Sequence, residues 1–255
     1  DLVIEANGRE SEVRAAYQAA VRRFDGLLDE LCEELLELRQ PADPIRCRVK
    51  GVVARRMHAA AAPFAADHFI TPMAAVAGSV AEEILGTMLG AARLARAYVN
   101  NGGDISLHLV GNAQFTVGLM DRPDRQGLLQ TMDIEAEDPV RGIATSGRHG
   151  RSFSLGIADA VTVLARTASQ ADAAATIIAN AVGIVGGWII AVTQLRVASS
   201  LYWSSIVDGL YLEDAWMGLI KPFFLGFVIV TIGCHVGLRT SGGTQGVGRA
   251  TTNAV

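Results

Sequence analysis

The segment Thr145–Ser152, TSGRHGRS, gathers the side chains best suited to chemistry. It places hydroxyls, glycines, two arginines and a histidine within eight residues. Such a group suits the binding of phosphate or carboxylate, because guanidinium and backbone N–H groups donate hydrogen bonds to anions. A surface loop that binds nothing would have the same composition, so the spacing alone leaves both interpretations open.

Two further groups have spacings that suit a site. In NNGGD, Asn100–Asp104, adjacent glycines before an aspartate let backbone amides approach a bound group, although most such turns only close hairpins. Asp172 and Thr176 are four residues apart, so on a helix their side chains project from one face. The sequence therefore offers three short groups of polar residues that the fold must bring together.

The first part of the chain predicts strands and helices. DLVIEA predicts a strand at Asp1–Ala6, and apolar residues three and four apart predict a long helix from Glu10 to Arg39. Val49–Val53 predicts a strand. A helix is expected to continue to about Tyr98 after the small residues of Met73–Ala81, which suit either tight helix packing or close approach to a ligand.

The following residues predict strands joined by turns. The predicted strands are Ile105–Val110, Phe115–Leu119, QTMDIEAED, a strand before the TSG turn, and Ala160–Ala165. His58 and His68 flank the small-residue segment, and each is interpreted as either an ordinary histidine or a ligand. The first 182 residues thus predict a soluble α+β domain.

Charge divides the chain near residue 182. Only four of the 22 basic and three of the 26 acidic residues follow it, and all three tryptophans do. Ala173–Leu195 carries no formal charge over 23 residues, and a membrane-spanning helix needs about 20. Neither part has the basic excess of a nucleic-acid binder. Three scattered cysteines indicate free thiols in a reduced compartment, and no signal peptide is evident at the start.

The order of motifs in residues 1–182 resembles the ApbE superfamily, and within it a group of uncharacterised ApbE-like proteins. The motifs are PMAAVAG, NNGGDI, ATSG and ADAVTVLA followed by ADAAAT. Known members of the superfamily are FAD:protein FMN transferases that use Mg²⁺. The resemblance implies an α+β ApbE-like (T-fold-like) domain that binds a small anionic, nucleotide or flavin ligand such as FAD or FMN.

The resemblance assigns residues to roles. Asp172 and Thr176 match the pair that holds the metal in the transferases, and hard oxygen ligands suit Mg²⁺. The remaining positions match the glycine-rich and hydroxyl-rich turns expected to bind the ligand: Asn101, Gly102, Gly103, Asp104, Thr145, Ser146 and Gly147.

Two departures leave the reaction open. The H-x-x-D-P-x-T-G element of the transferases is absent after the TSG turn, and Ala77-Gly78-Ser79-Val80 stands where they have a Lys-Gly pair. His149, in the shortened loop, is the weak candidate for an acid or base. If the domain is an enzyme, the resemblance implies a Mg²⁺-dependent transferase or hydrolase with an incomplete transfer motif.

Residues 183–255 resemble a different family, the MlaE-type permease of Mce lipid ABC transporters. GLIKPFFLGF and GCHVGLRTSGGTQGVGRATTNAV are similar to its signature. Pro222–Leu238 lacks formal charge and predicts either a short span, with Trp216, Lys221 and Arg239 at its ends, or a buried helix. The resemblance implies a truncated permease fragment, a partner ATPase, a lipid-shuttling subunit and phospholipid transport.

Three hypotheses therefore remain for the whole chain. It is a ligand-binding or enzymatic domain, a membrane transport component, or a recent joining of two genes within NAVGIVGG. The expected location is the inner membrane or the cytoplasm, with the first domain cytoplasmic. A helix that holds Asp172 and Thr176 in a metal site and then enters lipid is expected to bend at Gly183, Gly186 and Gly187.

Overall fold

The structure is a computed structural model and describes residues 2–120, 128–147, 160–193, 198–200 and 203–204. The chain separates into two compact units, residues 1–189 and 190–255. Nearly all described residues belong to the first unit, which combines helices and strands as the sequence predicts. His149 and most of the permease-like segment lie outside the described residues.

Five antiparallel strands form the main sheet of the first unit, in the order β1-β2-β3-β6-β7. A separate antiparallel pair, β4 and β5, is joined in register from Gln114↔Glu135 to Met120↔Leu128. The strands are β1 (Val3–Asn7), β2 (Arg96–Asn101), β3 (Asp104–Leu109), β4 (Gln114–Met120), β5 (Leu128–Glu135), β6 (Gly142–Ser146) and β7 (Val161–Ala165).

The described helices agree only partly with the predicted ones. Their bounds are α1 (Glu10–Phe24), α2 (Leu27–Glu33), α3 (Leu35–Leu38), α4 (Val52–Ala61), the 3₁₀ helices η1 (Ala62–Phe64) and η2 (Pro72–Ala75), α5 (Val76–Ala91) and α6 (Ala168–Thr193). The long helix predicted from Glu10 to Arg39 is three helices. Its first break is at Asp25 and Gly26: Asp25 leaves the helix with a ψ of 126°, and Gly26 has a left-handed φ of 77°, whereas an α-helix needs a negative φ.

Two other predictions were wrong. The strand predicted at Val49–Val53 is absent, because α4 begins at Val52 and includes Val53. Glu34 accepts hydrogen bonds from the amides of Lys50 and Gly51 and so holds the entry to this helix. The helix predicted to reach Tyr98 ends at Ala91, since the residues from Arg96 pair with both β1 and β3.

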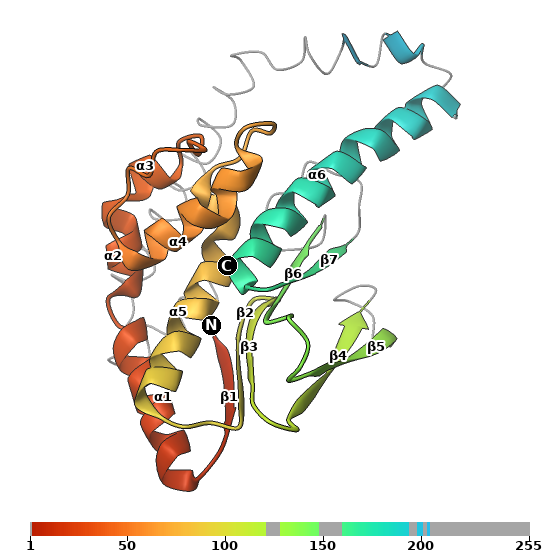
Figure 1. The fold of residues 1–255 in the computed structure, drawn as a ribbon. Helices are drawn as coiled ribbons and strands as arrows, with labels where there is room; N and C mark the ends of the chain where they lie inside the picture. Colours follow the sequence, from red (N-terminus) through yellow and green to blue (C-terminus); the bar gives the residue numbers. More distant parts are fainter. Residues whose placement is uncertain (1, 121–127, 148–159, 194–197, 201–202, 205–255) are drawn as a thin grey trace, which may run out of the picture. The chain divides into compact units, whose positions relative to one another are not determined.

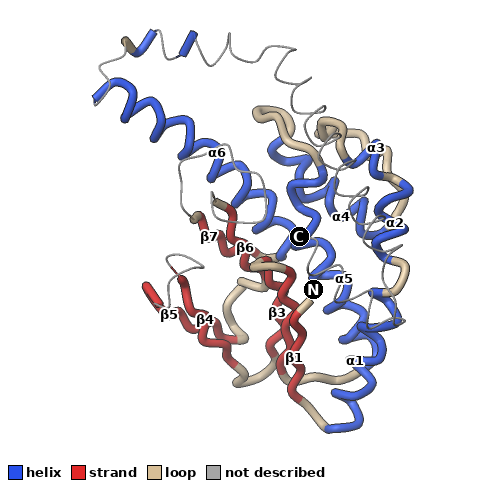
Figure 2. Tube along the Cα trace, turned by 180° about the vertical axis from the view of Figure 1, so that it is seen from behind, coloured by secondary structure: helices blue, strands red, loops and turns tan. Residues whose placement is uncertain are grey.

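Helix α5 is the central packing element of the unit. Buried residues of α5 pack with α1, α4 and one face of the sheet, where Ala97 and Val99 point. The alternate residue Tyr98 faces the other side and packs with Phe115 and the β4–β5 pair. Figures 1 and 2 show helices α1 to α5 on one side of the sheet and β4–β5 on the other.

Helix α6 packs into the unit with its first half. Alanines at intervals of two or four residues are fully buried, some against β6 and β7 and one against α4 and η2. They are Ala171, Ala173, Ala175 and Ala179. Later side chains on the same helix are exposed although apolar, including Val182, Val185 and Ile189 at 48% each. The helix therefore changes from a core element to an exposed apolar rod.

The helix is described from Ala168 to Thr193 and is continuous through Gly183, Gly186 and Gly187, where the bend is expected (Figure 1). Because the helix does not break, the predicted division after residue 182 falls inside α6 and remains a prediction. Within the described residues, two helical stretches are long and apolar enough to cross a membrane, Pro72–Ala91 and Ala168–Gly186. The first contains α5, which is the core helix of the unit.

Candidate functional site

Asp172 lies in the first turns of α6 and points to the start of α5. Its Oδ2 accepts a hydrogen bond of 2.9 Å from the amide of Gly78, and the amide of Ala77 also donates to this carboxylate. A helix N-terminus has unpaired N–H groups and a partial positive charge, so it receives an anion well. Here the anion is a side chain of the protein itself.

Asp104 is the second carboxylate of the site. It begins β3, and its Oδ1 accepts a hydrogen bond of 3.2 Å from the amide of Thr145 on β6. Burial raises the pKa of Asp104 to about 6, and the Thr145 amide lowers it in part. Burial and then the charge of Asp104 raise the pKa of Asp172 to about 8, against the two α5 amides. The two acidic groups are therefore close enough to repel each other when both are ionised.

The NNGGD turn is held against the same end of α5. Gly102 and Gly103 have φ values of 70° and 115°, which glycine adopts without strain. The amide of Gly103 donates to Asn100 Oδ1 at 2.8 Å, and Asn101 Nδ2 donates to the carbonyl of Ala77 at 3.2 Å. The turn thus closes the β2–β3 hairpin and also fixes Asp104 beside the start of α5.

The residues of the TSG turn begin in β6 and not in a loop. Thr145 is exposed and pairs with Thr162 of β7 through their hydroxyls at 3.0 Å. Ser146 and Gly147 are buried at the end of the strand, before the undescribed residues 148–159. The structure therefore brings Thr145, Asp104, Asn101 and Asp172 together and says nothing of His149.

The donor set suits a divalent cation. Two half-buried carboxylates lie near each other, and in the described part of the chain neither forms an ion pair with Lys, Arg or His. Thr176 follows Asp172 by one turn and is half-buried. Mg²⁺ is often held by one or two carboxylates with waters and phosphate oxygens. Within the described residues, no three side chains of His, Cys, Asp or Glu lie together so that they could hold a metal ion, so further ligands would have to be hydroxyls, carbonyls, waters or the bound molecule.

A close approach of backbone sets the position of α6. A Cβ added at Gly78 would lie 2.3 Å from the carbonyl oxygen of Ala168, and one added at Gly142 would lie 2.1 Å from the carbonyl carbon of Thr167. Both glycines thus leave space for the chain where α6 begins. The sequence left two interpretations of the small residues in Met73–Ala81, tight helix packing and close approach to a ligand. At Gly78 the first applies, because this contact is possible only where the residue has no side chain.

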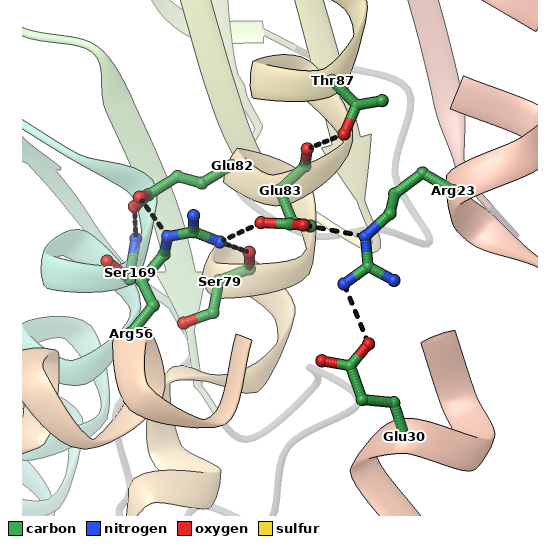
Figure 3. Close-up of polar contacts among 8 residues, drawn as sticks. All are labelled: Arg23, Glu30, Arg56, Ser79, Glu82, Glu83, Thr87 and Ser169. Carbon is green, nitrogen blue, oxygen red and sulfur yellow. Dashed lines mark hydrogen bonds and ion pairs between the residues drawn. The ribbon is translucent and has the colours of Figure 1, made fainter. Parts of the chain in front are cut away.

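One turn further along α5, ion pairs hold the same start of α6 (Figure 3). Glu82 Oε1 accepts a hydrogen bond of 2.7 Å from the amide of Ser169 in the first turn of α6. Arg56 of α4 pairs with Glu82 at 3.3 Å and with Glu83 at 3.0 Å, and it also donates to the carbonyl of Ser79. Arg23 extends the network from Glu83 to Glu30.

This network predicts a measurable effect on stability. Arg56→Met leaves Glu82 and Glu83 without one cation, and their side chains are only 17% and 13% exposed. Removing one partner of a largely buried pair costs about 3 kcal/mol, so the thermal midpoint of the full chain in detergent should fall by about 5–10 °C.

The control for this prediction is Arg14→Met, which removes the exposed Arg14–Glu10 pair on α1. An exposed pair contributes between about 0 and 1 kcal/mol, so its loss should leave the midpoint nearly unchanged. Equal shifts for the two variants would show that the Arg56 network does not stabilise the α5–α6 junction.

Sequence reasoning found part of this site. It chose Asp172 and Asp104 but assigned them to different roles, the metal and the glycine-rich turn. It missed the amides of Ala77 and Gly78 and the contact of Glu82 with Ser169. The S-x-x-E spacing of Ser79 and Glu82 and the glycine in the small-residue segment were the available signals, but nothing local indicates that Glu82 reaches α6.

Comparison with known proteins relates the two parts of the chain to two different families. The chain belongs to the family described as AbpE bacteria, whose model matches residues 1–193. Among its relatives is a UPF0280 protein of Methanopyrus kandleri, 36% identical over 182 residues, which cover 71% of this chain and 69% of that protein. Another UPF0280 protein, from Archaeoglobus fulgidus, is 37% identical over 56% of each chain.

The C-terminal part is similar to a second family. The model described as Permease MlaE matches residues 168–255. A probable ABC transporter permease protein of Rickettsia typhi is 38% identical over 79 residues, which are 31% of this chain and 30% of that protein. The chain therefore spans less than a third of this permease relative. Residues 168–193, matched by both family models, are the residues of α6.

Proposed function

We propose that the first domain binds an anionic, phosphate-containing ligand, of flavin or nucleotide type, together with Mg²⁺. The observation that carries the proposal is the pair of neighbouring, half-buried carboxylates, Asp104 and Asp172, whose pKa values are raised to about 6 and about 8. Groups shifted by burial and by a charged neighbour concentrate at functional sites. A bound cation would remove the repulsion between them.

Each residue of the site has a role in this proposal. Asp172 and Asp104 hold the metal, and Thr176 adds its hydroxyl one turn further along α6. The amides of Ala77 and Gly78 hold the Asp172 carboxylate in one orientation. Bound Mg²⁺ would neutralise phosphate oxygens of the ligand, and the exposed Thr145 hydroxyl is available to contact the same group. The proposal covers binding, and it extends the ApbE superfamily resemblance without assigning a reaction.

Calorimetry on the full chain in detergent tests this proposal. FAD, FMN, ADP and ATP are titrated with Mg²⁺ and again with EDTA. We expect at least one of them to bind only with Mg²⁺, and Asp172→Ala to abolish that binding because it removes a metal ligand. The proposal fails if none of the four binds, or if Asp172→Ala binds the same ligand with unchanged affinity.

A second function is carried by a separate observation, the match of residues 168–255 to Permease MlaE. Membrane association of this part is supported by that match and by the exposed apolar residues of α6. We propose that the chain works as a membrane component of an Mce-type phospholipid ABC transporter, with an ATPase as partner. Membrane fractionation tests this, since a chain that stays in solution without detergent would contradict it.

A further inference from the structure

Two loops of the first unit expose large apolar side chains to solvent. Ile45 is 93% exposed in the segment 39–51, between α3 and α4, and Phe69 is 81% exposed in the segment 65–71, between η1 and η2. These two segments are here called the docking loops. One exposed apolar side chain is ordinary, but two almost fully exposed ones on neighbouring loops indicate a contact surface.

The docking loops adjoin each other and α6. The amide of Ala42 donates a hydrogen bond of 2.8 Å to the carbonyl of Ile70, which joins one loop to the other. Both residues belong to an apolar cluster that includes Ala173 of α6, and Ile177 packs against that cluster. The exposed apolar part of α6 follows directly after Ile177. Figures 1 and 2 show the loops and this part of α6 at the same end of the unit, toward the top of each view.

The charge of the docking loops differs from that of the domain. The first 182 residues carry 23 acidic and 18 basic side chains, whereas the loops carry four cationic side chains and two carboxylates, Asp43 and Asp67. All four cations are exposed and form no ion pair with a described residue. They are Arg39, Arg46, Arg48 and Lys50. An anionic surface therefore attracts this end of the domain and repels the acidic remainder.

The first loop is held in the conformation that exposes Ile45. Asp43 Oδ1 accepts hydrogen bonds from the amides of Ile45 and Arg46, each at 2.9 Å. One of the two loop carboxylates is thus engaged by backbone donors. A second copy of the chain fits this surface less well, because a two-fold contact would bring the cationic loops of both copies together.

We propose that the docking loops lie on an anionic phospholipid bilayer, with Ile45 and Phe69 inserted among the headgroups and the four cations beside lipid phosphates. Apolar side chains that enter the headgroup region and basic residues around them act together in such contacts. The inference rests on the membrane association proposed above and extends it, because it places the folded domain itself against the lipid. It does not depend on the carboxylate site.

The test uses the exposed thiol of Cys47, which lies in the first docking loop. The full chain with Cys32→Ser and Cys234→Ser carries a fluorophore at Cys47 and is reconstituted into vesicles with a quencher on the lipid headgroups. The vesicles are phosphatidylcholine alone or an equal mixture with phosphatidylglycerol. We expect quenching that is stronger in the anionic vesicles and weaker at high salt.

A label at the opposite end of the domain is the control. Val110 is 55% exposed, and its amide donates to the carbonyl of Ala95, beyond the C-terminal end of α5, whereas the docking loops lie beside η2 at the start of α5. A fluorophore placed by Val110→Cys, in a chain with Cys47→Ser as well, should not be quenched.

Substitutions at exposed positions separate the two contributions. Ile45→Ser and Phe69→Ser should each lower the docking constant, taken from the quenched fraction, by about tenfold, as loss of one inserted apolar side chain implies. Val110→Ser should leave it unchanged. Arg46→Gln with Arg48→Gln should reduce quenching in the anionic vesicles and not in phosphatidylcholine alone. Thermal midpoints in detergent should be equal for all of these variants, which excludes unfolding as the cause.

The outcomes distinguish this inference from the proposal on which it rests. A chain that does not float with either vesicle contradicts both. A chain that floats while the Cys47 label stays unquenched overturns the docking of the loops alone, as does quenching that Ile45→Ser and Phe69→Ser leave unchanged. A Cys47 signal that follows protein concentration in detergent would show that the loops contact a second copy, and it too overturns the inference.

Discussion

Asp172→Asn should stabilise the metal-free chain and remove its response to Mg²⁺. Asparagine keeps an oxygen that can accept from the Gly78 amide but carries no charge beside Asp104. The variant therefore relieves both the burial of a charge and the repulsion between two carboxylates. We expect a gain of about 2–4 kcal/mol at pH 8, seen as a thermal midpoint about 5–10 °C higher than that of the unchanged chain in EDTA.

The pH dependence of this difference follows from the direction of the pKa shift. Asp172 has a folded pKa of about 8, above its ordinary value of 3.8, so between these values the folded chain binds more protons than the unfolded chain. Its contribution to stability is fully present below about pH 4 and is lost as the pH rises through about 8. The gap between Asp172→Asn and the unchanged chain should open over this interval.

Magnesium should reverse the order of the two proteins. Because metal ligands bind in their deprotonated form, Mg²⁺ should stabilise the unchanged chain more strongly as the pH approaches 8 and should leave Asp172→Asn unaffected. Asp29→Asn, at an exposed position on α2, is the control and should follow the unchanged chain. If Mg²⁺ stabilises Asp172→Asn as much as the unchanged chain, the carboxylate pair does not hold the metal.

Gly78→Ala should be among the most damaging single-methyl changes in the first unit. The new Cβ would lie 2.3 Å from the Ala168 carbonyl oxygen and 2.8 Å from the Ser169 amide nitrogen, so α5 and α6 would have to separate. Such overpacking costs about 3 kcal/mol or more, which predicts a midpoint lower by about 10 °C. Separation would also move Asp172 from the Gly78 amide, so binding that requires Mg²⁺ should be lost.

Gly86→Ala is the matched control on the same helix. No atom lies within 4 Å of a Cβ added at Gly86, and the residue is exposed. Alanine in a helix is favoured over glycine by about 0.5–1 kcal/mol, so this variant should be slightly more stable than the unchanged chain. A Gly78→Ala chain as stable as Gly86→Ala would mean that α6 does not depend on this contact.

The strands and turns that use local signals were predicted well. Alternation predicted β1, a strand was also predicted at Ala160–Ala165, where β7 lies, and the glycines of NNGGD predicted the turn whose φ values are positive. The order of motifs also indicated both families, which the comparisons confirm at the level of AbpE bacteria and Permease MlaE. These features depend on residues close in sequence, which is why a single sequence is enough to recognise them.

The features that escaped prediction depend on tertiary contacts. A strand is favoured by the β-branched residues Val49, Val52 and Val53. Instead, the Glu34 carboxylate accepts hydrogen bonds from the amides of Lys50 and Gly51, and α4 begins directly after them. Asp104 and Asp172 are 68 residues apart, and only the packing of α6 beside the β2–β3 turn brings their charges together. The function proposed for them is untested, as are the roles predicted for Thr176 and the TSG residues.

The carboxylate site and the membrane span proposed for this chain would draw on the same helix, α6. Beyond Ala179, the last fully buried alanine, 14 residues remain to Thr193. At 1.5 Å per residue they reach about 21 Å, whereas the hydrocarbon core of a bilayer is about 30 Å thick. Six further residues taken from the N-terminal side would draw Ala175 and Thr176 out of the domain. Full immersion of this helix and an intact carboxylate site are therefore mutually exclusive unless the span continues past Thr193.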